Sequence, residues 1–224
     1  MTESLEVASS PCAAGEADWG FEQGSDLVVL VLAGGEGKRM GGDKPERRLG
    51  DRRLIDRALD VARRYGTQVA IGLRAAGQIS VPDDVERVID QAGIDGPLAS
   101  LAAGTAWAKR CGARCLLTIP CDAPFLPYDL ARRLLTRLQA SDTAVAAPKS
   151  HGRTHPSCAL WRVSASGQLV AYLAGGRRSL IGFAEHLGFA IEDWGAAPRD
   201  PFFNVNTPDD LRAAENVLAH PHFE

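Results

Sequence analysis

Residues 32–44 combine glycines with cationic side chains in an order suited to binding a polyanion. They read Leu-Ala-Gly-Gly-Glu-Gly-Lys-Arg-Met-Gly-Gly-Asp-Lys and directly follow the apolar run Leu27–Leu32. Glycine lets backbone N–H groups approach phosphate oxygens, and Lys38, Arg39 and Lys44 supply neutralising charge. Ligands of open α/β sheets bind where such strands end, so the loop is suited to a nucleotide triphosphate. An ordinary glycine-rich turn is the alternative, which the three spaced cations disfavour.

Two common phosphate-binding motifs do not fit this loop. The dinucleotide fingerprint Gly-x-Gly-x-x-Gly fails because Met40 stands where the third glycine after Gly35 and Gly37 is required. The P-loop requires Lys after its second glycine, whereas Asp43 follows Gly42. The loop therefore belongs to another class of phosphate site.

Asp122 is the candidate metal ligand. It lies in segment 120–127, which holds three prolines and follows the apolar run 115–119. The prolines exclude a helix, so the carboxylate is expected at the same sheet edge as the glycine loop, where it would suit Mg²⁺. The alternative is that Asp122 only caps the following helix. Cys121 has no local basic partner and is predicted to be a buried neighbour rather than a catalytic thiolate.

Asp90 ends the strand-like run 85–89 and is expected at the same edge. Its carboxylate is suited to accept hydrogen bonds from a base or a ribose. The alternative is a turn-forming aspartate before Gly93. Pro97 then begins a helix, for which Asp95 is a candidate cap.

Two polar insertions follow later in the chain. Asn204 and Asn206 alternate across one residue, so in an extended stretch they share a face on which amides can bind a polar heterocycle. The alternative is turn chemistry before Thr207, which starts a helix. For His155, a structural role and a ligand role both stay open.

Apolar runs typical of strands alternate with helical patterns from residue 26 onward. Strands are expected at Leu27–Leu32, Gln68–Leu73, 85–89, 115–119, 143–147 and 158–161, and helices at 54–62, 98–108, 130–138 and after Thr207. This alternation predicts an α/β fold with a mostly parallel sheet covered on both faces. Residues 1–25 are small, polar and acidic, which predicts a disordered tail before a single domain at 26–224.

The composition excludes several functional classes. The net charge of -3 disfavours broad nucleic-acid binding. No apolar stretch approaches the roughly 20 residues that span a bilayer, so no membrane partner is expected. The five cysteines include no Cys-x-x-Cys pair, which disfavours a disulfide framework or a zinc site. The N-terminal residues lack an export signal, so a cytoplasmic location is expected.

These motifs resemble those of the molybdenum cofactor guanylyltransferases, nucleotidyltransferases that join GMP to molybdopterin. The matching segments are 32–44, Asp90 with 95–98, 120–127, 155–160 and 200–211, in the family's order. Pro-Cys-Asp together with Asn-Val-Asn-Thr-Pro narrows the resemblance to this branch of the superfamily. It implies a single-domain, Rossmann-like three-layer sandwich of the nucleotide-diphospho-sugar transferase type. The implied reaction transfers GMP from GTP to molybdopterin and releases pyrophosphate.

The resemblance also implies roles for matching positions. Arg39 and Lys44 would neutralise the triphosphate, and Asp122 would bind Mg²⁺, or Mn²⁺ in its place, together with GTP. Asp90 would contact the nucleoside. Backbone contacts to the nucleotide would come from Leu32, Ala33, Gly34 and Gly35, and the molybdopterin side would be lined by His155, Asn204 and Asn206.

Three features depart from the family pattern. Segment 50–54 lacks a proline often found there. The asparagine often found at the end of the second strand is absent, so the Ile71 backbone or Arg74 would have to replace its contact. Ser100 stands where Gly-Pro-Leu-Ala-Gly ends in glycine. The alternatives are a nucleotidyltransferase using CTP or another phosphorylated acceptor, and a non-catalytic GTP-binding partner in cofactor delivery. Implied partners besides GTP and molybdopterin are molybdopterin-inserting proteins and molybdoenzyme chaperones, in transient contact.

Overall fold

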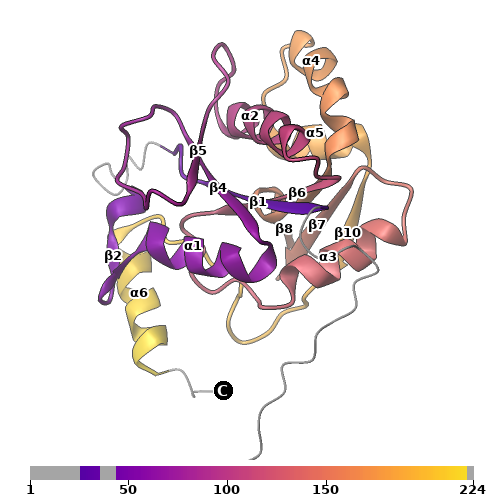
Figure 1. Cartoon of the computed structure of the whole chain (residues 1–224). Helices are drawn as coiled ribbons and strands as arrows, with labels where there is room; N and C mark the ends of the chain where they lie inside the picture. Colours follow the sequence, from indigo (N-terminus) through magenta and orange to yellow (C-terminus); the bar gives the residue numbers. More distant parts are fainter. Residues whose placement is uncertain (1–25, 36–43, 221–224) are drawn as a thin grey trace, which may run out of the picture.

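The computed structural model describes residues 26–35 and 44–220 and has a central sheet between two layers of helices (Figure 1). In sheet order the strands are β10 (Phe189–Asp193), β7 (Val145–Ser150), β9 (Leu160–Arg162), β6 (Cys115–Pro120), β1 (Leu27–Leu32), β4 (Gln68–Leu73) and β5 (Glu86–Ile89). β8 (Arg153–Thr154) pairs with β7, and β2 (Arg48–Leu49) with β3 (Arg52–Arg53) in a separate ribbon. In the main sheet, pairs that include β8 or β9 are antiparallel and the others parallel. The predicted, mostly parallel α/β sandwich is confirmed.

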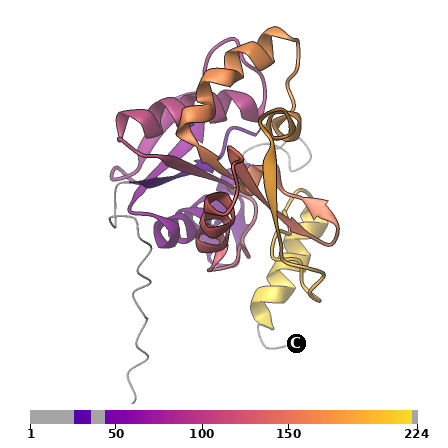
Figure 2. The same cartoon turned by 90° about the vertical axis from the view of Figure 1, so that its right-hand side faces the viewer.

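Helices cover both faces of the sheet (Figures 1 and 2). The longer segments are α1 (Leu54–Tyr65), α2 (Pro97–Arg110), α3 (Leu130–Gln139), α4 (Gly167–Ala174), α5 (Leu180–Leu187) and α6 (Pro208–Ala219), and the 3₁₀ turns are η2 (Lys44–Glu46), η3 (Pro156–Cys158) and η4 (Val163–Ser166). Because side chains alternate along a strand, β1 serves two cores. Val29 and Val31 pack in the core with α1 and α3, whereas Val28 and Leu30 pack in the core with α2, α4 and α5.

Three local expectations differ from the structure. The run expected as a strand at 158–161 is divided between η3, which ends at Cys158, and β9, which starts at Leu160. Asp95 is not the cap of α2, because Gly96 occupies the N-cap without a side-chain hydrogen bond. A third difference is that α4, α5, β10 and the short strands β2, β3 and β8 were not predicted.

Two earlier expectations concern the whole chain. Within the described ranges, none of the helices has the length and apolar character needed to cross a membrane. The predicted tail at 1–25 lies outside the described residues, so the division at residue 26 stays a prediction.

Gly104 allows α2 to lie close against β1. A Cβ atom at this position would be 2.5 Å from Leu30 Cδ2 and 3.3 Å from Leu116 Cδ2, and both leucines are fully buried. We expect Gly104→Ala to lower the free energy of unfolding by about 1–3 kcal/mol, measured by urea denaturation. Gly167→Ala is the matched control, because a Cβ there meets nothing within 4 Å. Equal stability of the two variants would contradict this packing.

Candidate active site

The carboxyl ends of β1, β4 and β6 bring the predicted site residues to one edge of the sheet. Hydrogen bonds extend the strand pairing past each end: Ala33 N–H donates to Gly72 (3.0 Å), Cys121 N–H to Leu32 (3.1 Å) and Asp90 N–H to Leu73 (2.8 Å). The glycine loop, Asp122 and Asp90 thereby start from neighbouring strand ends. The edge expected from the sequence is the one that the structure forms.

Lys44, Asp122 and Asn206 meet at this edge. Lys44 Nζ forms an ion pair with Asp122 Oδ2 and donates a hydrogen bond to Asn206 Oδ1 at 2.7 Å. Lys44 is 9% exposed, which is low for a lysine. The Val205 N–H donates to the backbone carbonyl of Asp122 at 2.8 Å, which holds the segment before α6 against the end of β6. Three separately predicted residues thus form one polar cluster.

Asp122 has one carboxylate oxygen that the described protein leaves unpaired. Oδ1 is buried and has no hydrogen-bond partner among the described residues. A buried acceptor without a partner is costly, so this oxygen is suited to a cation. The alternative role as a helix cap is wrong, because α3 begins at Leu130 with Asp129 at its N-cap.

The donor set around Asp122 fits a magnesium ion shared with a substrate. Within residues 26–35 and 44–220, no group of three or more His, Cys, Asp or Glu side chains could hold a metal. Mg²⁺ often takes only one or two carboxylates and completes its shell with water and substrate phosphates. A single carboxylate beside a loop predicted to bind phosphates matches that pattern.

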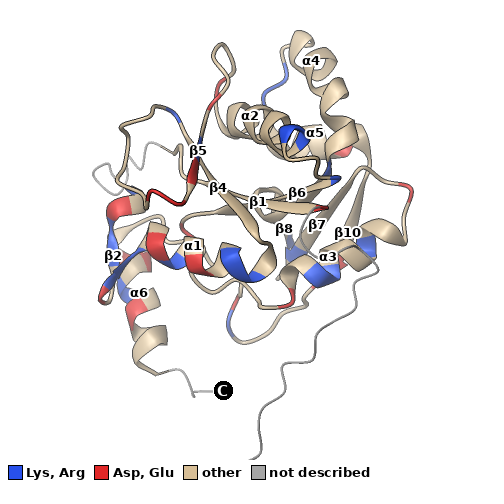
Figure 3. Cartoon of the chain, in the orientation of Figure 1, with Lys and Arg blue, Asp and Glu red and all other residues tan. Residues whose placement is uncertain are grey.

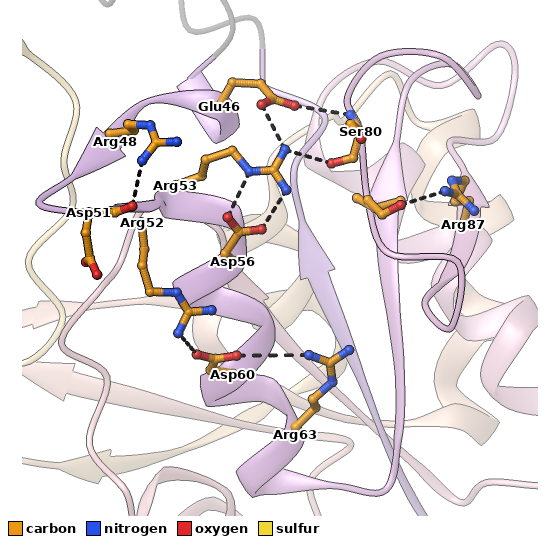
Figure 4. Close-up of polar contacts among 11 residues, drawn as sticks. Glu46, Arg48, Asp51, Arg52, Arg53, Asp56, Asp60, Arg63, Ser80 and Arg87 are labelled. Atoms are coloured by element: carbon orange, nitrogen blue, oxygen red, sulfur yellow. Dashed lines mark hydrogen bonds and ion pairs between the residues drawn. The ribbon is translucent and has the colours of Figure 1, made fainter.

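Arg53 anchors the short turn η2, which carries Lys44 (Figure 4). Its guanidinium donates to both carboxylate oxygens of Asp56 (2.8 and 2.6 Å), to Glu46 (2.9 Å) and to the Ser80 carbonyl (2.9 Å). Glu46 also accepts from the Ser80 N–H at 3.1 Å. These hydrogen bonds raise the pKa of Arg53, and the one from Arg53 lowers the pKa of Asp56. The network fixes the backbone from which Lys44 reaches the site.

Asp90 faces the glycine loop. Ser100 donates a hydrogen bond to its Oδ1 at 2.5 Å, and its Oδ2 would be 2.9 Å from a Cβ atom on Gly34. The same Cβ would be 3.4 Å from Arg74 Cγ, so Arg74 also lies beside the loop. Asp90 therefore lies beside Gly34, together with Ser100 and Arg74, and its contact with a nucleotide stays a prediction.

The backbone at the start of the loop is partly committed to the protein. The Ala33 N–H donates to Gly72, and the Ala33 carbonyl accepts from Gln78 Nε2 at 3.0 Å. The amides of Gly34 and Gly35 have no hydrogen-bond acceptor among the described residues. Among the predicted backbone contacts, these two amides are the donors left available to a ligand. Sequence analysis missed Gln78, whose distance of 45 positions from Ala33 hides this contact.

A second polar cluster joins the end of β7 to the segment before Asn204. Ser150 Oγ donates to Asp200 Oδ1 at 2.7 Å and lies 2.8 Å from His155 Nε2. The imidazole of His155 stacks on Phe202, with ring centroids 4.7 Å apart and planes inclined by 16°. Sequence analysis missed Ser150, because a serine in the polar segment 149–156 carries no signal of its partners.

The two asparagines differ in their surroundings. Val205 between them is fully buried, whereas Asn204 is half-buried and Asn206 exposed, as the alternation predicts. The Asn206 N–H donates to Asp210, which forms a capping box with Thr207 at the start of α6. Asn206 therefore combines turn chemistry in its backbone with a site contact in its side chain.

The remaining candidates are Arg39 and the cysteines. Arg39 lies outside the described residues. Burial raises the pKa of the Cys121 and Cys158 thiols, so Cys121 is confirmed as a buried neighbour. Acidic and basic residues both occur along α1 and α6 (Figure 3).

Comparisons with known proteins identify the family. Residues 29–188 match the model of the MobA-like NTP transferase domain. A molybdenum cofactor guanylyltransferase from Cereibacter sphaeroides is 40% identical over 200 residues, covering 86% of this chain and 97% of that protein. The chain belongs to the molybdenum cofactor guanylyltransferase family. A second relative of that name, from Acidiphilium cryptum, is 42% identical over 202 residues. This match covers 86% of this chain and 95% of that protein.

A solved structure has the same fold as this guanylyltransferase-family chain. Molybdopterin-guanine dinucleotide biosynthesis protein A from Archaeoglobus fulgidus superposes with a TM-score of 0.71 at 24% identity. The match covers 86% of this chain and 98% of the other. The resemblance and the three-layer nucleotidyltransferase fold predicted from the sequence are both confirmed.

Of the two loop glycines that the structure describes in this family member, Gly34 has less room than Gly35. A Cβ atom 2.9 Å from Asp90 Oδ2 forces the carboxylate or the loop to move. We expect Gly34→Ala to raise the KM for GTP about tenfold, the effect of roughly 1.4 kcal/mol, in a steady-state assay. Gly77→Ala is the control, because its Cβ would meet nothing within 4 Å. An unchanged KM would show that Asp90 and the loop do not act together on the nucleotide.

Proposed function

We propose that this chain transfers GMP from GTP to molybdopterin, forming molybdopterin guanine dinucleotide and pyrophosphate. The observation that carries the proposal is the cluster of Lys44, Asp122 and Asn206 beside the loop amides of Gly34 and Gly35. A buried cation, a carboxylate with one unpaired oxygen and two amide donors suit a metal-bound triphosphate. The names of the curated relatives indicate the guanylyl group and the molybdenum cofactor.

The reaction forms one phosphoanhydride bond, between the phosphate of molybdopterin and the α-phosphate of GTP, and breaks another, between the α- and β-phosphates of GTP. A terminal phosphate oxygen of molybdopterin attacks the α-phosphorus of GTP, and the bond to the bridging oxygen breaks as pyrophosphate leaves. The nucleophile is already an anion at neutral pH, so the protein need not supply a general base. The barrier lies in bringing two polyanions together.

The residues of the site lower this barrier electrostatically. Lys44, held in a poorly exposed position by Asn206, places a positive charge beside the triphosphate, and the amides of Gly34 and Gly35 donate to its oxygens. Fixed donors and charges in such a site stabilise charge that develops on the leaving group. Arg39 is predicted to add a second cation.

Asp122 is the residue proposed to hold Mg²⁺, or Mn²⁺ in its place. Its Oδ2 is paired with Lys44, and its unpaired Oδ1 is the atom available to an ion. When bound, the ion supplies positive charge to the phosphate oxygens. Asp122 would thus connect the metal with the lysine that binds the same phosphates.

The remaining roles follow from position at the edge. We assign the nucleoside contact to Asp90, beside the glycine loop, and the molybdopterin side to His155, Asn204 and Asn206. Transient contact with molybdopterin-inserting proteins and molybdoenzyme chaperones, and a cytoplasmic location, stay predictions.

Pyrophosphate release by the purified full chain tests the proposal. The assay offers GTP and CTP in parallel, each with molybdopterin and Mg²⁺. Release with GTP alone would support the proposal, whereas release with CTP alone would reassign the product to a cytosine dinucleotide. Binding of GTP without release from either nucleotide would favour a non-catalytic partner in cofactor delivery.

A further inference from the structure

Ser150, His155 and Asp200 form a hydrogen-bonded chain to which the proposed reaction assigns no joint role. Ser150 ends β7 and is fully buried, and His155 directly precedes η3. Asp200 lies 50 positions further along the chain, and its Oδ1 accepts from both the Ser150 hydroxyl and the Phe202 N–H (2.9 Å). A buried polar group needs such partners, but this chain also controls the proton on the imidazole.

The direction of the hydrogen bonds determines the form of His155. An ionised carboxylate can only accept, so the single proton of the Ser150 hydroxyl points to Asp200. The Ser150 oxygen must then accept from His155, which places a proton on Nε2. A neutral imidazole carries one N–H group, so Nδ1 of His155 is left as an acceptor.

The surroundings keep these two groups in the required charge states. Burial lowers the pKa of His155, Arg153 and His151 lower it further, and only Asp200 acts in the opposite direction. For Asp200 itself, burial acts to raise the pKa, but the hydrogen bonds from Ser150 and the Phe202 amide outweigh it, and the pKa is lowered. At neutral pH the histidine is therefore neutral and the aspartate ionised.

The ring of His155 is also held by an aromatic contact. One face stacks on Phe202, whose ring also makes an edge contact with Trp194 at 5.2 Å. The backbone of His155 is held separately, because its amide N–H donates to the Pro148 carbonyl at 2.9 Å. Nδ1 has no hydrogen-bond partner among the described residues. An imidazole that is half-buried, stacked on one face and bonded at Nε2 thus has one unpaired acceptor.

His155 directly precedes η3, which lies near the metal-binding candidate. Cys158, at the end of η3, has its pKa raised mainly by burial and also by the carboxylates of Asp122 and Asp200, so η3 lies near both. The segment that starts at Asp200 continues to Asn206, whose amide contacts Lys44. His155 is thereby tied to the loop that borders the phosphate cluster.

We propose that Asp200 and Ser150 are positioning residues that hold His155 in its Nε2–H form, so that Nδ1 accepts a hydrogen bond from an N–H group of the pterin. The inference rests on the proposed function, because the pterin belongs to the acceptor substrate assigned there. A pterin carries ring N–H and amino groups, which are hydrogen-bond donors. An oriented acceptor such as Nδ1 binds a donor and disfavours a group that can only accept, such as a carbonyl oxygen.

The tautomer of His155 can be observed without any activity. Long-range ¹H–¹⁵N spectra of the full chain labelled with ¹⁵N-histidine distinguish the two neutral forms, and His155→Phe identifies the signal. We expect the Nε2–H form in the unaltered protein and a mixture of forms in Ser150→Ala. An Nδ1–H form in the unaltered protein would overturn the proposal.

Kinetics distinguish positioning from a purely structural role. Ser150→Ala is expected to raise the KM for molybdopterin about tenfold, the size of one hydrogen bond, while the KM for GTP stays within about twofold. Thr105→Ala is the control, because it removes another buried hydroxyl, bonded only within α2, and should leave both constants unchanged. Equal changes in both KM values for Ser150→Ala would show that the hydrogen bonds of Ser150 have only a structural role.

Two substitutions of His155 test the acceptor itself. His155→Asn retains an acceptor near the position of Nδ1 and should keep a lower KM for molybdopterin than His155→Phe, which retains only the stacked ring. In the unaltered protein this KM should rise as the pH falls through the lowered pKa of His155, since protonation removes the acceptor. His155→Asn should lack this acid limb. If the unaltered protein releases no pyrophosphate, the proposed function fails, whereas normal release with unaffected variants would refute only the inference.

Discussion

Turnover with GTP and molybdopterin is expected to fall about a thousandfold or more when Asp122 is replaced by Ala. The substitution removes the unpaired buried oxygen proposed to hold Mg²⁺ and also the partner of Lys44. Losing one preorganised electrostatic group commonly costs about 10²–10³ in kcat, and here the metal is lost as well. Pyrophosphate release at saturating GTP and Mg²⁺ measures the effect.

The controls must separate lost chemistry from lost folding. Asp122→Asn retains the shape and an oxygen but loses the charge, so it should be almost as inactive as Asp122→Ala. Lys44 without its partner is an uncompensated buried charge, and thermal unfolding measures that cost independently. Glu192, on β10, is paired with Arg133 of α3, and Glu192→Ala should leave the rate unchanged. A near-normal rate of Asp122→Ala at saturating Mg²⁺ would refute the metal role.

Features encoded within a few residues could be predicted from the sequence. Thr207 and Asp210 form the capping box of α6 because the interacting groups are three positions apart. The apolar run of β1 predicted a buried central strand, since parallel strands are covered on both faces. The common edge of the site followed from the same rule, which places the carboxyl ends of parallel strands together.

Contacts between distant segments could not be predicted in the same way. The rule for strand ends places Lys44 and Asp122 at one edge, but the 78 positions between them hide the ion pair that the folded chain forms. Ser150 gives no signal because its burial depends on Asp200, 50 positions away. The direction of β9 is equally hidden, since a strand of three residues has no pattern that distinguishes parallel from antiparallel pairing.

Lys44→Ala is expected to lower kcat/KM for GTP by about 10²–10³, the effect of removing one preorganised charge. The charge of Lys44 acts strongly because its side chain is poorly exposed, so water screens it little. Its placement is also fixed by Asn206 and, through η2, by Arg53. Lys109→Ala is the matched control. Lys109 lies in the last turn of α2 and is exposed to solvent, so its loss removes the same charge from a well-screened position and should leave kcat/KM unchanged.

Lys44→Arg tests whether position matters beyond charge. The guanidinium is planar and larger than an ammonium group, and Lys44 Nζ already contacts Asp122 and Asn206 at close range. We expect Lys44→Arg to have a higher kcat/KM than Lys44→Ala but a lower one than the unaltered protein. The arginine guanidinium cannot contact both Asp122 and Asn206 from the position that Lys44 Nζ occupies. An unchanged kcat/KM in Lys44→Ala would show that the triphosphate is neutralised elsewhere. Full activity in Lys44→Arg would show that only the positive charge at this position matters. The contact of Lys44 with Asn206 would then contribute nothing to the reaction.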